Sequence, residues 1–315
     1  MTMEAVPGVF PAGTPVERLV SGLGFTEGPV WLPADERLLF TDVPGNTIHS
    51  WGPEGHSVWL DNSHFAIGLT LAPDGAVLAC EQATRSLVRY ASSARGAERT
   101  VLASEFDGRL LSAPNDVVVR SDGAVFFTDP PFGVRLDEAE VVFYSVGMEQ
   151  TSCNVYKVTD DPRRPVLVTT EVYRPNGLAF SPDELLLYVS DTSDRTRHVR
   201  VLQLGPDDVA VSVREQLELP AGVPDGLCCD VAGNLYCSGA DGVYVYDPAG
   251  TLLGVVPVPE MVANCTFGGQ DGRTLFMTAS TSLYSTRVEQ PGAVLGVPGV
   301  PMPREAPVSA PRPAC

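Results

Sequence analysis

Basic residues, long apolar runs and the motifs of several enzyme classes are scarce or missing in this chain, and each absence excludes a kind of protein. Lys157 is the only lysine, which leaves one candidate for Schiff-base catalysis. Asp and Glu number 39 against 21 Lys and Arg, so the net charge is -18 at pH 7. Such a surface repels phosphate, and we expect neither nucleic acid nor an anionic membrane as a partner.

No segment is apolar for long enough to cross a membrane, and the first residues, MTMEAVP, lack the basic and apolar parts of an export signal. We therefore expect a cytoplasmic protein. The sequence contains no G-x-S-x-G, H-E-x-x-H, C-x-x-C or P-loop motif, and its four histidines show no zinc-site spacing. These absences disfavour a serine hydrolase, a zinc protease and a nucleotide-dependent enzyme.

The seven cysteines are odd in number, and most lie in apolar, strand-like runs, so the sequence indicates no disulfide framework. The adjacent pair Cys228 and Cys229 could form a redox or soft-metal site. Neighbouring residues of a strand point to opposite faces, however, and this disfavours that interpretation.

A short apolar strand, an acidic turn and a second strand recur six times along the chain. Each unit spans roughly 40 to 60 residues and fits four antiparallel strands, which is typical of a β-propeller. We predict an all-β, six-bladed β-propeller with four-stranded antiparallel blades. The turns are Ala34-Asp35, Asp74-Gly75, Asp122-Gly123, Asp183-Glu184, Ala232-Gly233 and Asp271-Gly272.

The two ends of the chain complete this prediction. After Asn264 the last unit has room for about three strands, so the segment Pro15 to Val20 should supply the fourth and close the ring. We assign residues 1–14 to an N-terminal extension, 15–289 to the propeller, and 290–315 to a Pro-rich tail that we expect to be disordered. The longest insertion, residues 129–153, should form a loop or lid over one face.

One position of the repeat carries oxygen donors in five of the six units. It lies seven residues before Asp74 and its counterparts in four other units, and eight residues before Asp35 in the first. Equivalent positions on successive blades face the same axis, so these residues should form a ring. Asn-Gly and Asp-Gly pairs are ordinary turn formers when taken singly, but a poor turn former, Glu27, shares the position. The ring positions are Glu27, Ile67, Asn115, Asn176, Asp225 and Asn264.

Two carboxylates and three amides make a set of hard oxygen ligands suited to a divalent cation. We expect one ion, with Ca²⁺ favoured by the ligand type and Mg²⁺, Zn²⁺, Mn²⁺ or Fe²⁺ left open. Such an ion would polarise an ester carbonyl while water attacks and a ring carboxylate accepts the proton.

Five motifs together resemble the SMP-30/gluconolactonase family. They are TEGPVW at 26–31, APNDVVV at 113–119, FTDPPFG at 127–133, RPNGLAFSPD at 174–183 and PDG at 224–226. The resemblance implies a six-bladed propeller with a divalent metal in its central channel and hydrolysis of a small sugar lactone. It implies that Glu27, Asn176 and Asp225 hold the metal and that Asp225 is the general base. Asn115 would hold the substrate or a metal-bound water, at longer range from the ion.

The substrate-binding positions depart from the family pattern. Leu111 and Phe132 stand where bacterial members often carry Asn and Tyr, and Ala113 stands where mammalian members carry Arg. Fewer hydroxyl-binding partners predict a less hydroxylated lactone. Ile67 could form an apolar wall, while Asn264 either lines the channel or satisfies backbone groups at a strand end.

Two other functions stay open, and the sequence gives no indication of the oligomeric state. A related metal propeller that hydrolyses phosphotriesters or other esters would use the same ring. A non-catalytic propeller would use the metal structurally and fill every coordination position with protein oxygen. Because we expect polar residues at the channel mouth, we rank the non-catalytic propeller third among the three functions.

Overall fold

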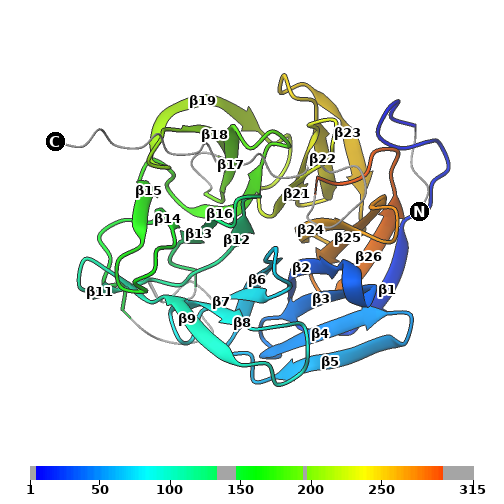
Figure 1. Cartoon of the computed structure of the whole chain (residues 1–315). Helices are drawn as coiled ribbons and strands as arrows, with labels where there is room; N and C mark the ends of the chain where they lie inside the picture. Colours follow the sequence, from blue (N-terminus) through cyan, green and yellow to red (C-terminus); the bar gives the residue numbers. More distant parts are fainter. Residues whose placement is uncertain (1–4, 133–146, 194–196, 294–315) are drawn as a thin grey trace, which may run out of the picture.

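The chain forms a closed ring of sheets around a central axis (Figure 1). This computed structural model describes residues 5–132, 147–193 and 197–293, with the side chains of 213–216 left out. Six four-stranded antiparallel sheets follow one another, which confirms the predicted six-bladed β-propeller. Residues 294–315 of the predicted tail and 133–146 of the predicted lid lie outside the described residues.

Each blade runs from an innermost strand outward. Blade one contains β2 (Thr26–Leu32), β3 (Arg37–Asp42), β4 (Thr47–Gly52) and β5 (Gly55–Asp61), with the short η1 (Pro33–Asp35) between its first strands. Blade two contains β6 (Ala66–Leu71), β7 (Val77–Glu81), β8 (Ser86–Tyr90) and β9 (Arg99–Ala103), and the small hairpin of β10 (Glu105–Phe106) and β11 (Arg109–Leu110) follows it. Blade three contains β12 (Val117–Val119), β13 (Val125–Asp129), β14 (Asn154–Lys157) and β15 (Val166–Thr169).

The second half repeats this order. Blade four contains β16 (Pro175–Phe180), β17 (Leu186–Asp191), β18 (His198–Leu204) and β19 (Ala210–Glu218). Blade five contains β20 (Leu227–Cys229), β21 (Leu235–Gly239), β22 (Gly242–Tyr246) and β23 (Leu252–Pro257). Blade six contains β24 (Val262–Gly268), β25 (Thr274–Ala279), β26 (Ser282–Arg287) and, as its outermost strand, β1 (Glu17–Ser21).

The N-terminal strand closes the ring, as the sequence predicts. β1 pairs antiparallel with β26, with Glu17 opposite Ser285 and Ser21 opposite Ser282. The strand begins at Glu17 rather than at Pro15, and the Pro15 carbonyl accepts a hydrogen bond of 2.9 Å from Thr286 Oγ1. β1 therefore covers the edge of β26 that would otherwise be unpaired, and the last sheet joins the two ends of the chain.

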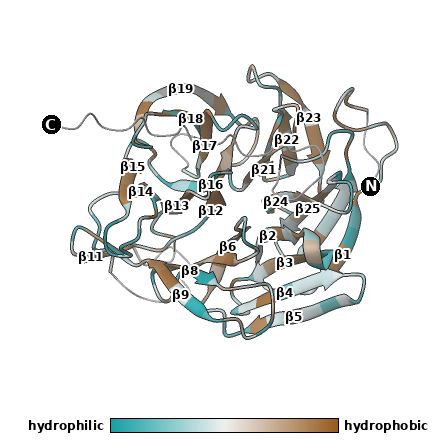
Figure 2. Cartoon of the chain, viewed as in Figure 1, coloured by the Kyte–Doolittle hydropathy of each residue, from teal (hydrophilic) through white to brown (hydrophobic). Residues whose placement is uncertain are grey.

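Apolar residues recur on strands around the whole ring (Figure 2). The second strand of blade one illustrates the packing, because Leu38, Leu39 and Phe40 are successive residues and all are fully buried. A strand covered on both faces needs apolar residues at every position rather than at alternate ones. The clusters that result join each blade to the next and hold the innermost strands rigidly around the axis. In the described part of the chain, no helix has the length and apolar composition needed to cross a membrane.

Candidate functional site

The ring positions lie at the beginnings of the six innermost strands. Glu27, Ile67, Asn176 and Asn264 are early residues of β2, β6, β16 and β24. Asn115 and Asp225 stand two residues before β12 and β20. Asp225 is partly exposed and the other five are buried.

Glycines beside the ring positions allow neighbouring inner strands to touch. A Cβ atom built on Gly28 would stand 1.9 Å from the carbonyl oxygen of Ile67, and one on Gly177 would stand 2.3 Å from that of Asp225. Neither position admits a side chain, because backbone atoms occupy the space. The small residue after each of these ring positions therefore sets how closely adjacent blades approach at the axis.

Hydroxyl groups on the second strands hold the ring backbone from the neighbouring blade. Thr41 Oγ1 donates a 3.0 Å hydrogen bond to the carbonyl of Ile67, and Thr128 Oγ1 donates one of 2.8 Å to the carbonyl of Asn176. Each contact crosses from one blade to the next. A buried carbonyl is thereby satisfied and its side chain is kept at a fixed angle to the channel.

Aspartates at the ends of second strands fix the segment that enters the ring. The carboxylate of Asp129 accepts the backbone N–H groups of Ser112 and Ala113, both at 2.8 Å. The carboxylate of Asp42 accepts hydrogen bonds from the backbone N–H groups of residues 24 and 25, and that of Asp191 accepts them from residues 173 and 174. In three blades the chain therefore turns into its innermost strand along the same path, two or three residues before the ring position.

The surroundings of the two ring carboxylates, Glu27 and Asp225, disfavour their charged forms. Burial raises the pKa of Glu27 from 4.5 to about 7, against hydrogen bonds of 2.8 Å from Gly28 N and 3.1 Å from Asn264 Nδ2. Burial first, and then the negative charge of Glu27, raises the pKa of Asp225 well above its ordinary range, while a hydrogen bond from Asn176 opposes the change. Asp225 Oδ1 is buried and has no hydrogen-bond partner among the described residues. An unpaired carboxylate oxygen close to a second carboxylate is a position for a proton or a cation.

A third carboxylate, which the sequence analysis did not select, lies beside this pair. Asp116 stands where four other blades have the glycine after the ring position. Its oxygens accept the N–H groups of Val117 at 2.9 Å and Leu178 at 3.0 Å, so it links blades three and four. Burial raises the pKa of Asp116 to about 6, and its charge raises the pKa of both Glu27 and Asp225. The sequence signal was the break in the ring-residue-then-glycine pattern.

The predicted substrate residues occupy different surroundings. Ile67 and Leu111 share one hydrophobic cluster, and Leu111 is fully buried, with its carbonyl accepting a 2.5 Å hydrogen bond from Arg85 Nε. The ring of Phe132 lies 5.9 Å from the guanidinium carbon of Arg174. The structure therefore brings Ile67 and Asn264 to the ring, packs Leu111 in the core, and sets Phe132 against an arginine.

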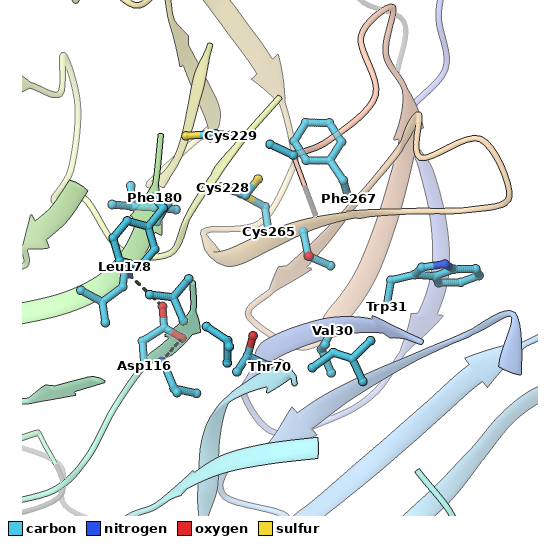
Figure 3. Close-up of a pocket in the computed structure, with 18 of the residues that line it drawn as sticks. Val30, Trp31, Thr70, Asp116, Leu178, Phe180, Cys228, Cys229, Cys265 and Phe267 are labelled. Carbon is cyan, nitrogen blue, oxygen red and sulfur yellow. Dashed lines mark hydrogen bonds between the residues drawn. The ribbon is translucent and has the colours of Figure 1, made fainter. Parts of the chain in front are cut away.

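A cavity of about 400 Å³ continues the channel further along the same inner strands. Asp116 and Asn264 are at its boundary with the ring, and Figure 3 shows Asp116 hydrogen-bonded to Leu178 at the cavity wall. The rest of the wall is largely apolar, with Val30, Trp31 and Phe267 among its members. The polar ring thus stands at one end of a channel whose other part is apolar.

The candidate site mixes carboxylates with amides. Within residues 5–132, 147–193 and 197–293 no three His, Cys, Asp or Glu side chains form a ready metal cluster. Any cation at the ring would therefore depend on amide oxygens as well as on the two carboxylates.

These features define a class of protein: a six-bladed propeller whose axial channel carries paired carboxylates and amides from separate blades. Residues 25–281 match the family described as SMP-30/gluconolactonase/LRE-like region, and the chain belongs to this family. A gluconolactonase of Zymomonas mobilis is 32% identical over 306 residues, which cover 89% of this chain and 83% of that protein. The pentonolactonase XacC of Haloferax volcanii is 31% identical over 81% of both chains.

Solved structures agree. The structure of a gluconolactonase from Xanthomonas campestris superposes with a TM-score of 0.79 at 32% identity and covers 88% of this chain and 90% of its own. The predicted family resemblance is therefore confirmed over nearly the whole propeller, and the three relatives named here are lactonases.

Proposed function

We propose that this protein hydrolyses a small sugar lactone or a related lactone at the carboxylate–amide ring, with the help of one divalent cation. The observation that carries the proposal is the pair of acidic ring residues from blades one and five: Glu27 is buried, and Asp225 has a buried Oδ1 with no hydrogen-bond partner among the described residues. Burial, and then the charge of Glu27, raises the pKa of Asp225. Protein folding gains nothing from burying two carboxylates together, so such a pair points to a ligand of opposite charge or to proton transfer.

The residues present fit a divalent cation. Asp225 Oδ1 is buried without a hydrogen-bond partner among the described residues, and a cation would satisfy it. Glu27, Asn176 and Asp225 would hold the ion, with Asn115 at longer range. When bound, the ion supplies a Lewis acid that polarises the lactone carbonyl. The oxygen ligands favour Ca²⁺, and the other four metals named above stay as alternatives.

The protein's own residues carry the proton. Asp225 accepts a proton from the water that adds to the lactone carbonyl carbon. The ring ester C–O bond then breaks, and the proton passes to the leaving alkoxide oxygen to give the open hydroxy acid. The amide of Asn115 orients the substrate.

The substrate positions support a lactone with few hydroxyl groups. Ile67 is an apolar ring position, and Phe132 stands where bacterial members often carry Tyr, whereas Leu111 is fully buried and offers no surface to a substrate. Asn264, which holds Glu27, is the polar group left for a substrate hydroxyl or for positioning. A site with fewer polar partners discriminates less in favour of polyhydroxylated substrates.

The test is a pH-drop assay with purified protein over aldonolactones, aliphatic lactones, an aryl ester and a phosphotriester, before and after chelation. We expect lactone turnover that chelation removes and a divalent ion restores. Asp225→Asn should lower kcat by about 10²-fold or more, whereas Asp74→Asn, on an exposed turn outside the ring, should not. Full activity in chelated protein or in Asp225→Asn would contradict the mechanism, and turnover of the phosphotriester alone would replace the substrate class.

A further inference from the structure

Two buried thiols face each other across the join between blades five and six. Cys228 of β20 and Cys265 of β24 have their Sγ atoms 3.5 Å apart, and the two residues are 8% and 2% exposed. Both line the axial cavity, where Figure 3 shows them at neighbouring points of the wall. The proposed hydrolysis uses neither thiol.

The contact does not involve the adjacent Cys229, whose pairing with Cys228 the sequence analysis disfavoured. Cys229 packs with Leu235 and Tyr246 in one hydrophobic cluster, whereas Cys228 packs with Phe267 in another. The two neighbours therefore face opposite sides of β20, as residues of a strand do. The thiol that meets Cys228 is 37 residues away in the chain.

Backbone contacts keep the two thiols together. Gly226 N donates to the carbonyl of Ala263 at 2.8 Å, and Ser238 Oγ donates to the same carbonyl at 2.8 Å. A Cβ atom on Gly226 would meet the side chain of Asn264 at 2.1 Å, so the two inner strands are already as close as they can be. The register that sets the two sulfurs side by side is thus fixed by the fold rather than by the thiols.

We propose that Cys228 and Cys265 form a reversible disulfide when the protein is exposed to a peroxide. One thiolate attacks a peroxide oxygen, which gives a sulfenic acid and, with a proton, releases water. The second thiol attacks the sulfenic sulfur, the S–S bond forms and a second water leaves. The sulfurs approach by about 1.5 Å to reach bonding distance. A thiol reductant reverses the reaction.

The cavity makes the pair accessible to a small oxidant. Its volume of about 400 Å³ exceeds what a peroxide molecule occupies, and both cysteines contribute to its wall. Burial, and then the contact with Cys265, raises the pKa of the Cys228 thiol well above its ordinary value. Thiolate is scarce at neutral pH for this reason, so oxidation is slow and its rate rises with pH.

The experiment uses the full-length protein treated with increasing hydrogen peroxide, then alkylated in denaturant and mapped by mass spectrometry. Cleavage on the N-terminal side of aspartates puts Cys228 and Cys265 on different peptides, because Asp230 and Asp247 lie between them. We expect the number of free thiols among the seven cysteines to fall by two. The two peptides should appear joined, with a mass about 2 Da below their sum, and dithiothreitol should separate them.

Single substitutions provide the controls. Cys228→Ser and Cys265→Ser should each abolish the joined peptide, while Cys229→Ser, which shares a peptide with Cys228, should retain it. Circular dichroism checks that each variant is folded, and the mapping of the wild-type protein decides the matter if a variant is not. An unchanged number of free thiols in folded, peroxide-treated protein, or a cross-link that joins other cysteines, would overturn the proposal. None of these results depends on lactonase activity.

Discussion

The side-chain amide of Asn264 donates a 3.1 Å hydrogen bond to the carboxylate of Glu27, and so joins the last blade to the first. The two residues are 237 positions apart in the sequence. The bond favours the charged form of Glu27 and opposes the effect of burial.

Replacing Asn264 by Ala should weaken binding of a divalent cation by about 10- to 100-fold, the range found when a partner of a metal ligand is removed. Calorimetric titration of chelated protein measures the change. Gln270→Ala is the matched control, because Gln270 Nε2 donates a 3.0 Å hydrogen bond to Glu36 across the same join, but on the exposed surface. Equal affinities of wild type and Asn264→Ala would remove Asn264 from the site.

Protein freed of divalent ions should lose stability as the pH rises from about 5 to about 7.5. Burial raises the pKa of Glu27 from 4.5 to about 7, so over this interval the folded protein holds a proton that the unfolded chain has released. The free energy of unfolding therefore falls with rising pH, on the order of 1–3 kcal/mol in all. Asp116, with its pKa raised to about 6, acts in the same direction.

Urea unfolding of chelated protein at the two pH values measures this difference. A bound divalent ion prefers the charged carboxylates, so adding Ca²⁺ should raise stability more at the higher pH than at the lower. Chelated protein that is more stable at pH 7.5 than at pH 5 would contradict the proposed state of Glu27.

Gly177→Ala should destabilise the protein by about 1–3 kcal/mol or more, because its methyl group would stand 2.3 Å from the carbonyl oxygen of Asp225. The inner strands of blades four and five would have to separate at the ring, so cation binding should weaken as well. Gly147→Ala is the control, since no atom of the described residues lies within 4 Å of a Cβ at that position. Thermal unfolding and metal titration check both variants, and an unchanged Gly177→Ala would show that the blades can separate freely.

Asp129→Ala should cost about 2–4 kcal/mol, because the buried N–H groups of Ser112 and Ala113 would each lose an acceptor at 2.8 Å. Asp129→Asn keeps one acceptor oxygen and should cost about half as much. Asp35→Ala, which removes a surface contact to Arg37, should change stability by less than about 0.5 kcal/mol. Urea unfolding separates these cases, and a cost for Asp129→Ala no larger than that of Asp35→Ala would refute the role of this carboxylate.

Repeat phase made the fold predictable from the sequence. Each unit had to be one blade, and equivalent positions of a propeller meet at the axis, so counting back from the turns selected inner-strand residues such as Glu27 and Asn176 without any contact information. The closing strand also followed from counting, because the last unit was one strand short. Its start could be fixed only to within two residues, at Glu17 rather than Pro15.

The other features of the site depend on which side chains meet between blades, and the repeat period of the sequence does not determine those contacts. Asp116 is one residue out of phase, and its role follows from a hydrogen bond to Leu178 in the next blade. The thiol of Cys228 meets that of Cys265 because two inner strands are in register, whereas the sequence analysis disfavoured a pair with Cys229 and named no other partner. The burial of Leu111 likewise follows from the packing of the segment that leads into blade three.

The position of β1 determines when this protein can finish folding during translation. Its partner, β26, ends at Arg287, so the first strand leaves the ribosome some 260 residues before the segment it pairs with. Until then the nascent chain has an unpaired strand at its beginning and a stack of blades that cannot become circular. Completion of the annulus is therefore a late event, which has to wait until β26 is available to pair with β1.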